Sequence, residues 1–272
     1  MAHPITSVAR SAWRRQGIAE GERLIAEETA IAFTYNGSSY AVMMATPQDL
    51  PDFALGFSLT EGIVHARDEI SELEIVESDH GIELRMWLAE HSGIAFSERR
   101  RHLAGPTGCG LCGIESLAEA LRPPQRVSAG RTITPAEIMK ALDTLAPRQE
   151  LNRQTRAVHA AAFWTPEDGL VALREDVGRH NALDKLAGAL IGEGVPCGTG
   201  LALLTSRVSV EMVQKAAAVG IPMLVAVSAP TALAVRTAAS AGITLVAIAR
   251  GDGFEVFTHP QRIARDAAAH VA

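Results

Sequence analysis

Alternating apolar and polar residues mark the first part of the chain with a regular pattern. The alternation covers residues 31–35 and returns over residues 40–44, with Asn36-Gly37 between the two runs. Asn-Gly favours a type I′ turn, because both central residues of that turn need a positive φ. The sequence therefore predicts a β-hairpin here, whereas residues 1–28 show no clear period and predict a flexible lead-in.

A helix and a second strand pair are predicted after the hairpin. Thr46-Pro47 is typical of a helix N-cap followed by a proline in the first turn. Residues 50–57 then carry apolar side chains at helical spacing, which predicts one buried stripe. Alternation at residues 73–75 and 82–88 predicts two further strands. The first half of the chain is thus expected to be a small α+β unit.

The second half of the chain has a different pattern. Thr134-Pro135-Ala136-Glu137 is a capping box that should open a helix through Leu145. Short, continuously apolar strands then alternate with helices, as buried parallel strands with crossover helices do. The expected elements are strands 157–164 and 170–174, helix 179–191, strand 201–205, helix 208–219, strand 223–227, helix 231–241 and strand 245–249.

These elements together predict an α/β protein with two parts. Residues 1–125 are expected to form the smaller α+β subdomain, with a cysteine-containing loop at its end. Residues 126–272 are expected to form an α/β subdomain. The length of 272 residues is sufficient for one large domain or two modest ones, each with a core.

Composition and charge exclude several classes of protein. Three cysteines cannot staple a chain of this length, so a disulfide scaffold is excluded. The net charge of −6 argues against a general nucleic-acid-binding surface. No apolar run approaches the roughly 18 residues of a membrane helix, and Met1 to Arg15 lacks the apolar core of a secretory signal. We therefore expect a cytoplasmic protein with no membrane or nucleic-acid partner.

Cys109 and Cys112 form a C-x-x-C pair within residues 105–113, where four glycines in nine residues predict a loop. A thioredoxin-like redox pair and a structural zinc site both fit poorly, the latter because two more ligands are needed. A zinc deaminase would require an H-x-E motif that is missing. An inert buried loop cysteine is the simplest alternative. We favour a mobile, reactive thiol, because the basic run at Arg99-Arg100-Arg101 would lower its pKa.

A second group of candidate residues follows the predicted strands. Carboxyl ends of parallel strands and helix N-termini are where α/β proteins bind phosphates. Serine and threonine here could be ordinary helix caps, but caps do not explain arginines in three of four loops. A phosphorylated or nucleotide-like ligand is the favoured interpretation. The residues are Arg179, Ser206, Arg207, Ser228, Thr231 and Arg250.

Three weaker signals are interpreted structurally. Glu211 and Lys215 are spaced as an i, i+4 pair and predict a solvated ion pair. Cys197 is expected to be incidental. The methionines at positions 43, 44, 212 and 223 are expected to fill the core.

Several stretches resemble one known family, the FdhD family of formate dehydrogenase accessory sulfurtransferases. The resemblance covers nearly the whole chain in order. It implies a cytoplasmic homodimer that takes persulfide sulfur from a cysteine desulfurase. That sulfur is passed to the bis(molybdopterin guanine dinucleotide) molybdenum cofactor before insertion into formate dehydrogenase. It also implies a C-terminal three-layer αβα part with a cytidine-deaminase-like sheet that has lost the zinc signature. The matching stretches are residues 35–63, TGCGLCGIESL at 107–117, EDVGRHNALDKL at 175–186, TSRVSVEMVQKAA at 205–217 and SAPTALAV at 228–235.

The resemblance assigns roles to individual residues. Cys109 matches the persulfide cysteine of the family and Cys112 matches its neighbour. The family's cofactor segment falls on Ile248-Ala249-Arg250-Gly251-Asp252-Gly253. This chain departs from the family at Ile248, where an aromatic residue is usual, and at Gly253, where a basic residue is usual. No catalytic metal of the protein's own is expected.

The acceptor cofactor suits the residues at the strand ends. We expect Arg179, Arg207 and Arg250 to hold the phosphates of its guanine nucleotides, with Ser206, Ser228 and Thr231 lining the same pocket. The competing class is a non-catalytic chaperone that binds the molybdenum cofactor without carrying sulfur.

Overall fold

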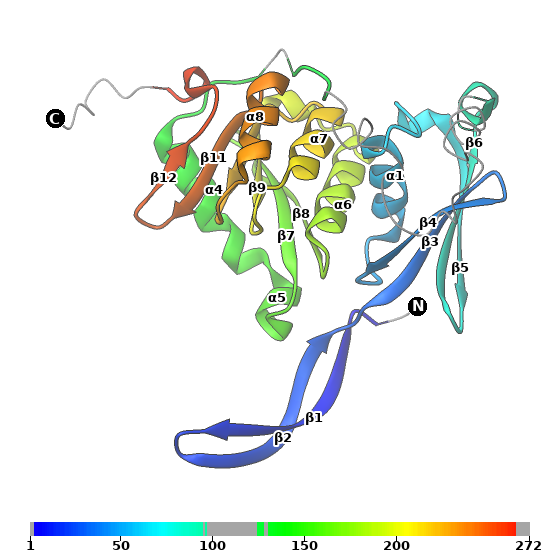
Figure 1. The fold of residues 1–272 in the computed structure, drawn as a ribbon, viewed down its shortest axis with the longest axis vertical. Coiled ribbons are helices and arrows are strands. Elements are labelled where there is room, and N and C mark those ends of the chain that lie inside the picture. The colour runs from blue at the N-terminus through cyan, green and yellow to red at the C-terminus, as the bar shows by residue number, and fades with distance from the viewer. Residues whose placement is uncertain (1–2, 95, 97–123, 128–129, 265–272) are drawn as a thin grey trace.

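The computed structural model describes residues 3–94, 96, 124–127 and 130–264. Within this part of the chain lie two sheets, the helices packed on them and a separate two-stranded arm (Figure 1). Cys109, Cys112 and the basic run lie outside the described residues. The subdomain boundary at 125/126 therefore stays a prediction. No helix in the described ranges is long and apolar enough to cross a membrane.

The N-terminal sheet confirms the predicted α+β unit. Its strand order is β4-β3-β6-β5, and helix α1 packs on its inner face. Asn36 and Gly37 have φ of 48° and 74°, which confirms the predicted hairpin turn. The bounds are β3 (Thr29–Tyr35), β4 (Ser38–Ala45), α1 (Leu50–Thr60), the 3₁₀ helix η1 (Arg67–Glu69), β5 (Ile70–Ser78) and β6 (Gly81–Leu88).

The start of α1 differs from the prediction. Its N-cap is Asp49, at φ 54°, and the proline of its first turn is Pro51. Thr46 does not cap the helix, because its polar groups are used elsewhere. Its amide donates to Asp176 Oδ2 at 3.0 Å, and its Oγ1 accepts from the amide of Val177 at 3.2 Å. Thr46 thus joins the two subdomains.

The C-terminal sheet has the order β12-β11-β10-β9-β7-β8. Helix α4 packs on one face, and α6, α7 and α8 pack on the other, which confirms the three-layer α/β arrangement. The bounds are α4 (Pro135–Arg148), α5 (Glu150–Thr155), β7 (His159–Thr165), β8 (Gly169–Asp176), α6 (Arg179–Gly192), η2 (Cys197–Thr199), β9 (Leu201–Leu204), α7 (Val210–Ala218), β10 (Met223–Ala226), α8 (Ala232–Ala241), β11 (Thr244–Arg250), β12 (Gly253–Val256) and η3 (Pro260–Arg262).

The predicted helices and strands of this half are confirmed, with one qualification. Strands β9, β10 and β11 are parallel to one another, whereas β7 is antiparallel to both β8 and β9, and β12 is antiparallel to β11. The capping box forms as predicted, with Thr134 Oγ1 accepting from the Glu137 amide. Strand β12 and helix α5 are additions that the pattern did not indicate.

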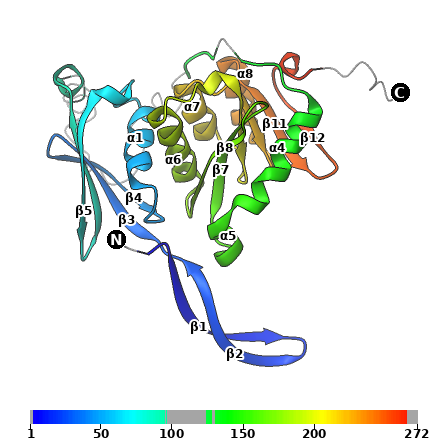
Figure 2. The same ribbon diagram turned by 180° about the vertical axis from the view of Figure 1, so that it is seen from behind.

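The N-terminal residues are not a flexible lead-in. They form β1 (Ile5–Arg14) and β2 (Gly17–Ala26), an antiparallel hairpin that projects away from the rest of the molecule (Figures 1 and 2). We call this hairpin the arm. Both of its faces are largely exposed, so no buried face imposes an apolar period on its sequence.

Helices α1 and α6 hold the two subdomains together. A Cβ at Gly56 would lie 1.7 Å from the carbonyl oxygen of Asp184, and one at Gly188 would lie 1.9 Å from that of Asp52. Only glycine allows backbones to approach so closely.

The prediction that Met44 fills the core is wrong, because the strand register turns it outward and leaves it 50% exposed.

Candidate functional site

The strand-end segments singled out in the sequence share one edge of the C-terminal sheet. Strand β7 is antiparallel to both of its neighbours, β8 and β9, so β8 and β9 run in the same direction. Strands β10 and β11 run parallel to β9. The carboxyl ends of four strands and the start of β7 at His159 therefore meet at this edge, which we call the strand-end edge.

Backbone hydrogen bonds join the neighbouring segments of the strand-end edge. The amide of Val208 donates to Ala229 O at 3.3 Å, and the amide of Thr231 donates to Val208 O at 2.9 Å. The amide of Ile248 donates to Ser228 O at 3.3 Å. The segments after β9, β10 and β11 thus form a continuous surface.

Arg179 and His180 begin helix α6 at the strand-end edge. Both are partly buried, and Arg179 Nε and His180 Nε2 are shielded from solvent with no hydrogen-bond partner within the described ranges. His180 Nε2 lies 3.9 Å from Glu211 Oε2. Burial, helped by the adjacent Arg179 guanidinium, lowers the pKa of His180 to about 4. His180 is therefore neutral at pH 7, and Arg179 carries the positive charge of this cluster.

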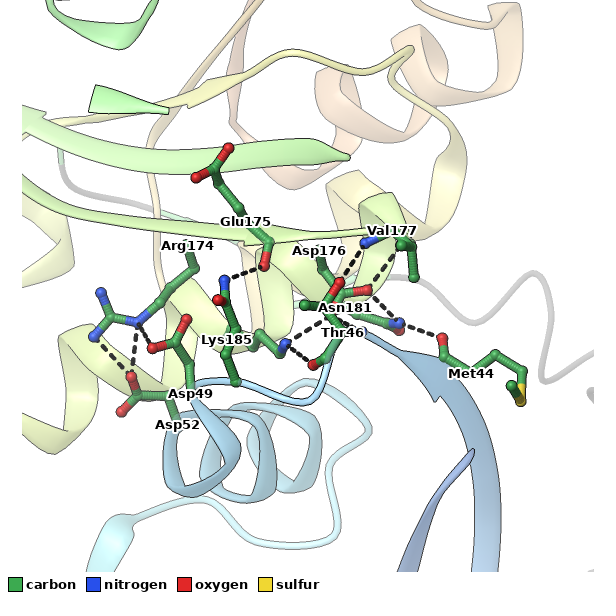
Figure 3. Close-up of polar contacts among 12 residues, drawn as sticks. Met44, Thr46, Asp49, Asp52, Arg174, Glu175, Asp176, Val177, Asn181 and Lys185 are labelled. Atoms are coloured by element: carbon green, nitrogen blue, oxygen red, sulfur yellow. Dashed lines mark hydrogen bonds and ion pairs between the residues drawn. The ribbon is translucent and has the colours of Figure 1, made fainter. Parts of the chain in front are cut away.

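Asp176 holds this segment against the N-terminal subdomain (Figure 3). It is fully buried, and its Oδ1 accepts from the Gly178 amide at 2.8 Å and from Asn181 Nδ2 at 2.9 Å. Its Oδ2 accepts from Lys185 Nζ at 2.6 Å. The hydrogen bonds of Asp176 therefore fix the backbone of residues 176–181. They hold Arg179 and His180 in place at the strand-end edge.

Two of the three hydroxyl groups predicted to line the site, those of Ser206 and Thr231, have local partners. Ser206 is buried, and its Oγ donates to Arg207 O at 3.1 Å. Thr231 is the N-cap of α8, and its Oγ1 accepts from the Ala234 amide at 3.2 Å. Arg207 is exposed, whereas Ser228 is partly buried. The capping interpretation thus holds for Thr231. A ligand-binding role for Ser206, Arg207, Ser228 and Thr231 stays a prediction.

The segment predicted to bind the cofactor forms the end of β11 and the turn into β12. Ile248 has φ 53° and lies in an irregular part of the strand pairing, whereas Ala249 is buried. Arg250, Gly251 and Asp252 are exposed at the tip of this hairpin. The arginine and the glycine are thus available to a ligand.

Arg179 and Arg250 mark opposite ends of the strand-end edge. Arg179 follows β8 and Arg250 ends β11, and four strand spacings separate these two strands. At the usual spacing this is about 19 Å. The predicted residues therefore line an extended edge and do not surround one phosphate group.

A cavity of about 380 Å³ opens at the same edge, on the α4 side of the sheet. Among the described residues in its wall, Thr205 and Val227 immediately precede Ser206 and Ser228, but none of the predicted binding residues is included. Its wall consists of Leu142, Leu145, Ala146, Gln149, Asn152, Val158, His159, Thr205 and Val227.

Sequence reasoning missed His159 and misplaced Lys215. His159 is brought to the edge by strand pairing, and burial together with Arg179 lowers its pKa. The prediction of a solvated Glu211–Lys215 pair is wrong. Lys215 is buried and lies 3.0 Å from Asp184 and 2.8 Å from Glu61. No local spacing indicates these partners.

The described residues contain no cluster of three or more metal-ligating side chains.

Comparison with known families identifies the family to which the whole chain belongs. A sequence model of the FdhD/NarQ family matches residues 26–264. The chain belongs to the FdhD/NarQ family. Members of the FdhD/NarQ family with similar sequences carry the name sulfur carrier protein FdhD. The relative from Agrobacterium fabrum is 54% identical over 257 residues, which cover 94% of this chain and 95% of the relative.

Two further relatives and a solved structure agree with this assignment. Sulfur carrier proteins FdhD of Cupriavidus necator and Brucella abortus are 50% and 52% identical, over 96% and 93% of this chain and 91% and 94% of their own. A crystal structure of a proposed formate dehydrogenase accessory protein from Desulfotalea psychrophila matches with a TM-score of 0.74 at 26% identity. The match covers 96% of this chain and 100% of the other, so it confirms the α/β fold described above.

Proposed function

We propose that this protein is a sulfur carrier, with Cys109 as the residue that accepts sulfur. The observation that carries the proposal is the 54% identity, over 94% of the chain, to a protein named as a sulfur carrier. The donor is a cysteine desulfurase, and the acceptor is the bis(molybdopterin guanine dinucleotide) molybdenum cofactor destined for formate dehydrogenase. The protein acts in the cytoplasm as a homodimer.

The loading step requires a nucleophilic thiolate. The Cys109 thiolate attacks the outer sulfur of the desulfurase persulfide, so that a new sulfur–sulfur bond forms on Cys109. The sulfur–sulfur bond of the donor breaks, and the donor cysteine leaves as a thiolate. The basic run Arg99-Arg100-Arg101, which precedes Cys109 in the sequence, would favour such a thiolate. Cys112 is the nearest second thiol in the sequence.

The strand-end edge supplies the surface for the acceptor. Helix N-termini of α6 and α8 and the side chains of Arg179, Arg207 and Arg250 suit nucleotide phosphates. The separation of about 19 Å between the two ends of the edge favours an extended ligand with two nucleotides over a single mononucleotide.

Mass spectrometry after incubation with a cysteine desulfurase and cysteine tests the carrier role. We expect the peptide with Cys109 to gain the mass of one sulfur atom, and a Cys109→Ala variant to lose this gain. Cys197→Ala is the matched control, because Cys197 is buried and burial raises the pKa of its thiol to about 11.

Complementation separates a carrier from a chaperone. If Cys109→Ala still supports active formate dehydrogenase as well as the unaltered chain does, sulfur transfer through Cys109 is excluded. The protein would then be a non-catalytic chaperone of the molybdenum cofactor.

A further inference from the structure

The cavity at the strand-end edge has a wall that contacts to phosphates do not explain. Its volume of about 380 Å³ lies within the range of about 300–1,000 Å³ that small-molecule sites occupy. Leu142 and Leu145 come from α4, whereas Val158 and Val227 adjoin strands of the sheet. A flat ring between them would therefore contact apolar atoms on both of its faces.

Gln149 is a buried polar side chain of this wall without a structural role. It is 7% exposed and occupies the N-cap position of α5, yet its side chain makes no capping bond. Glu175 performs the capping, because its carboxylate accepts from the amides of Leu151 and Asn152, both at 2.8 Å. Among the described residues, none hydrogen-bonds to the Gln149 side-chain amide. A buried amide without a partner is costly, so its place at a cavity wall indicates a ligand that pairs with it.

Two more polar side chains of the wall can pair with a ligand. Within the described part of the chain, no residue hydrogen-bonds to the side-chain amide of Asn152 or to the imidazole of His159. Burial and the nearby Arg179 guanidinium lower the pKa of His159, so its ring is neutral at pH 7 and offers one donor and one acceptor. With Gln149, the wall thus presents three uncharged groups, each of which can both donate and accept.

The composition of the wall excludes several classes of ligand. Its described residues include no lysine or arginine to hold a phosphate or a carboxylate, and no carboxylate to hold a cation. A wholly apolar ligand would leave the two amides unpaired. The ligand that fits is an uncharged flat ring with donors and acceptors along one edge. The 2-amino-4-oxopyrimidine edge, which pterins and guanines share, is of this kind.

The cavity lies between the two arginine-bearing ends of the strand-end edge. His159 begins β7, and Thr205 and Val227 follow β9 and β10. These strands stand between β11, which ends at Arg250, and β8, which precedes Arg179. In the acceptor of the proposed function, the pterins lie at the centre next to the metal, and the guanines lie beyond the phosphates at the two ends. A central cavity therefore matches a pterin better than a guanine.

We propose that this cavity holds a pterin ring of the acceptor, with Gln149, Asn152 and His159 pairing with its 2-amino-4-oxopyrimidine edge. The inference rests on the acceptor named in the proposed function but not on sulfur transfer through Cys109. Glu175 is a positioning residue for this site, because it fixes the start of the helix that carries Asn152.

Fluorescence titration of unsubstituted pterin with the full chain tests the site in the absence of the metal, the sulfur donor and formate dehydrogenase. We expect pterin to bind. Lumazine, in which an oxo group replaces the 2-amino group, should bind at least about tenfold more weakly, because the pairing of one edge atom is lost. Equal binding of lumazine, or no binding of pterin, would overturn the proposal.

A leucine variant separates a binding role of Gln149 from a structural one. Gln149→Leu should weaken pterin binding at least about tenfold, because the ring edge loses a buried partner. Its melting temperature should be no lower than that of the unaltered chain, because the amide has no partner among the described residues. Gln154→Leu, at an exposed position of the same helix, is the matched control and should bind pterin unchanged. Unchanged pterin binding by Gln149→Leu, or a lower melting temperature, would overturn the binding role.

Competition with guanosine distinguishes the two rings that share the edge. Displacement of pterin by guanosine at equal or higher affinity would assign the cavity to a guanine and overturn the pterin assignment. Failure of this inference is distinct from failure of the carrier role. Sulfur on Cys109 without pterin binding would overturn the cavity assignment alone, whereas pterin binding without sulfur on Cys109 would overturn the carrier role alone.

Discussion

Lys185 Nζ lies 2.6 Å from Asp176 Oδ2, and neither side chain is exposed to solvent (Figure 3). The same ammonium group donates to Thr46 O at 2.8 Å. One buried ion pair therefore ties the end of the N-terminal sheet to the segment that carries Arg179. The orientation of the strand-end edge depends on contact between the two subdomains.

Removing one partner of this pair should destabilise the protein strongly. Lys185→Met would leave the Asp176 carboxylate buried without its counter-charge, which costs about 3–5 kcal/mol. Chemical denaturation measures this as a lower free energy of unfolding. Arg85→Ala is the control, because its ion pairs with Glu74 and Glu83 lie at the surface, and we expect little change there. Equal effects of the two variants would contradict the structural role of Lys185.

The contact between α1 and α6 should not tolerate a methyl group. Gly56→Ala would place a Cβ 1.7 Å from Asp184 O, so the helices must separate. We expect a loss of about 1–3 kcal/mol or more. Gly192→Ala is the control within α6, because its Cβ would meet Leu55 Cδ2 at an ordinary 3.7 Å. Thermal unfolding followed by circular dichroism distinguishes the two, and an unchanged Gly56→Ala melting temperature would contradict this packing.

His180 should make the protein less stable in mild acid. Its pKa is about 4 in the folded chain, below its ordinary value of 6.5. The unfolded chain therefore binds a proton that the folded chain does not, and stability falls as the pH drops from about 6.5 towards 4. The side chains that face His180 are Arg179, Lys215, Glu211 and Glu61.

The contribution of His180 is measured as a difference between two variants. Buried carboxyl groups with raised pKa values, such as Glu175, oppose the trend, so the slope of a single protein is not informative. We expect melting temperatures of His180→Gln to fall less between pH 7 and pH 4.5 than those of the unaltered chain. His80→Gln, in an exposed turn, should follow the unaltered chain. A His180→Gln profile parallel to the unaltered one would refute the assignment.

Guanosine diphosphate should bind to the isolated protein through the strand-end edge. Because Arg179 and Arg250 lie at opposite ends of the edge, loss of either charged hydrogen-bond donor, in Arg179→Ala or Arg250→Ala, should weaken nucleotide binding at its own end roughly tenfold or more by calorimetry and leave the other end unchanged. Arg148→Ala on the exposed end of α4 should bind as well as the unaltered chain. The absence of binding by the unaltered chain would remove the nucleotide role of the edge.

Local patterns were sufficient for most of the secondary structure. Asn36-Gly37 determined the hairpin turn because the required φ values belong to those two residues alone. Thr134 and Glu137 determined a helix start because both partners of the capping box lie within one turn. The arm was not predicted, because neither of its faces is buried by the chain itself and its sequence therefore has no regular apolar period.

The sequence by itself determined most of the elements, the order in which they alternate in the second half of the chain, and the residues that follow each strand end. Only the tertiary structure decided the partners of Lys185 and Lys215, the close approach at Gly56, and the place of His159 at the edge. Many of these contacts join residues far apart in the sequence, such as Lys215 and Glu61 at a separation of 154 positions, and the others depend on which elements become neighbours. Hydrophobic period and turn chemistry act over a few residues, whereas such contacts arise only when whole elements pack against one another.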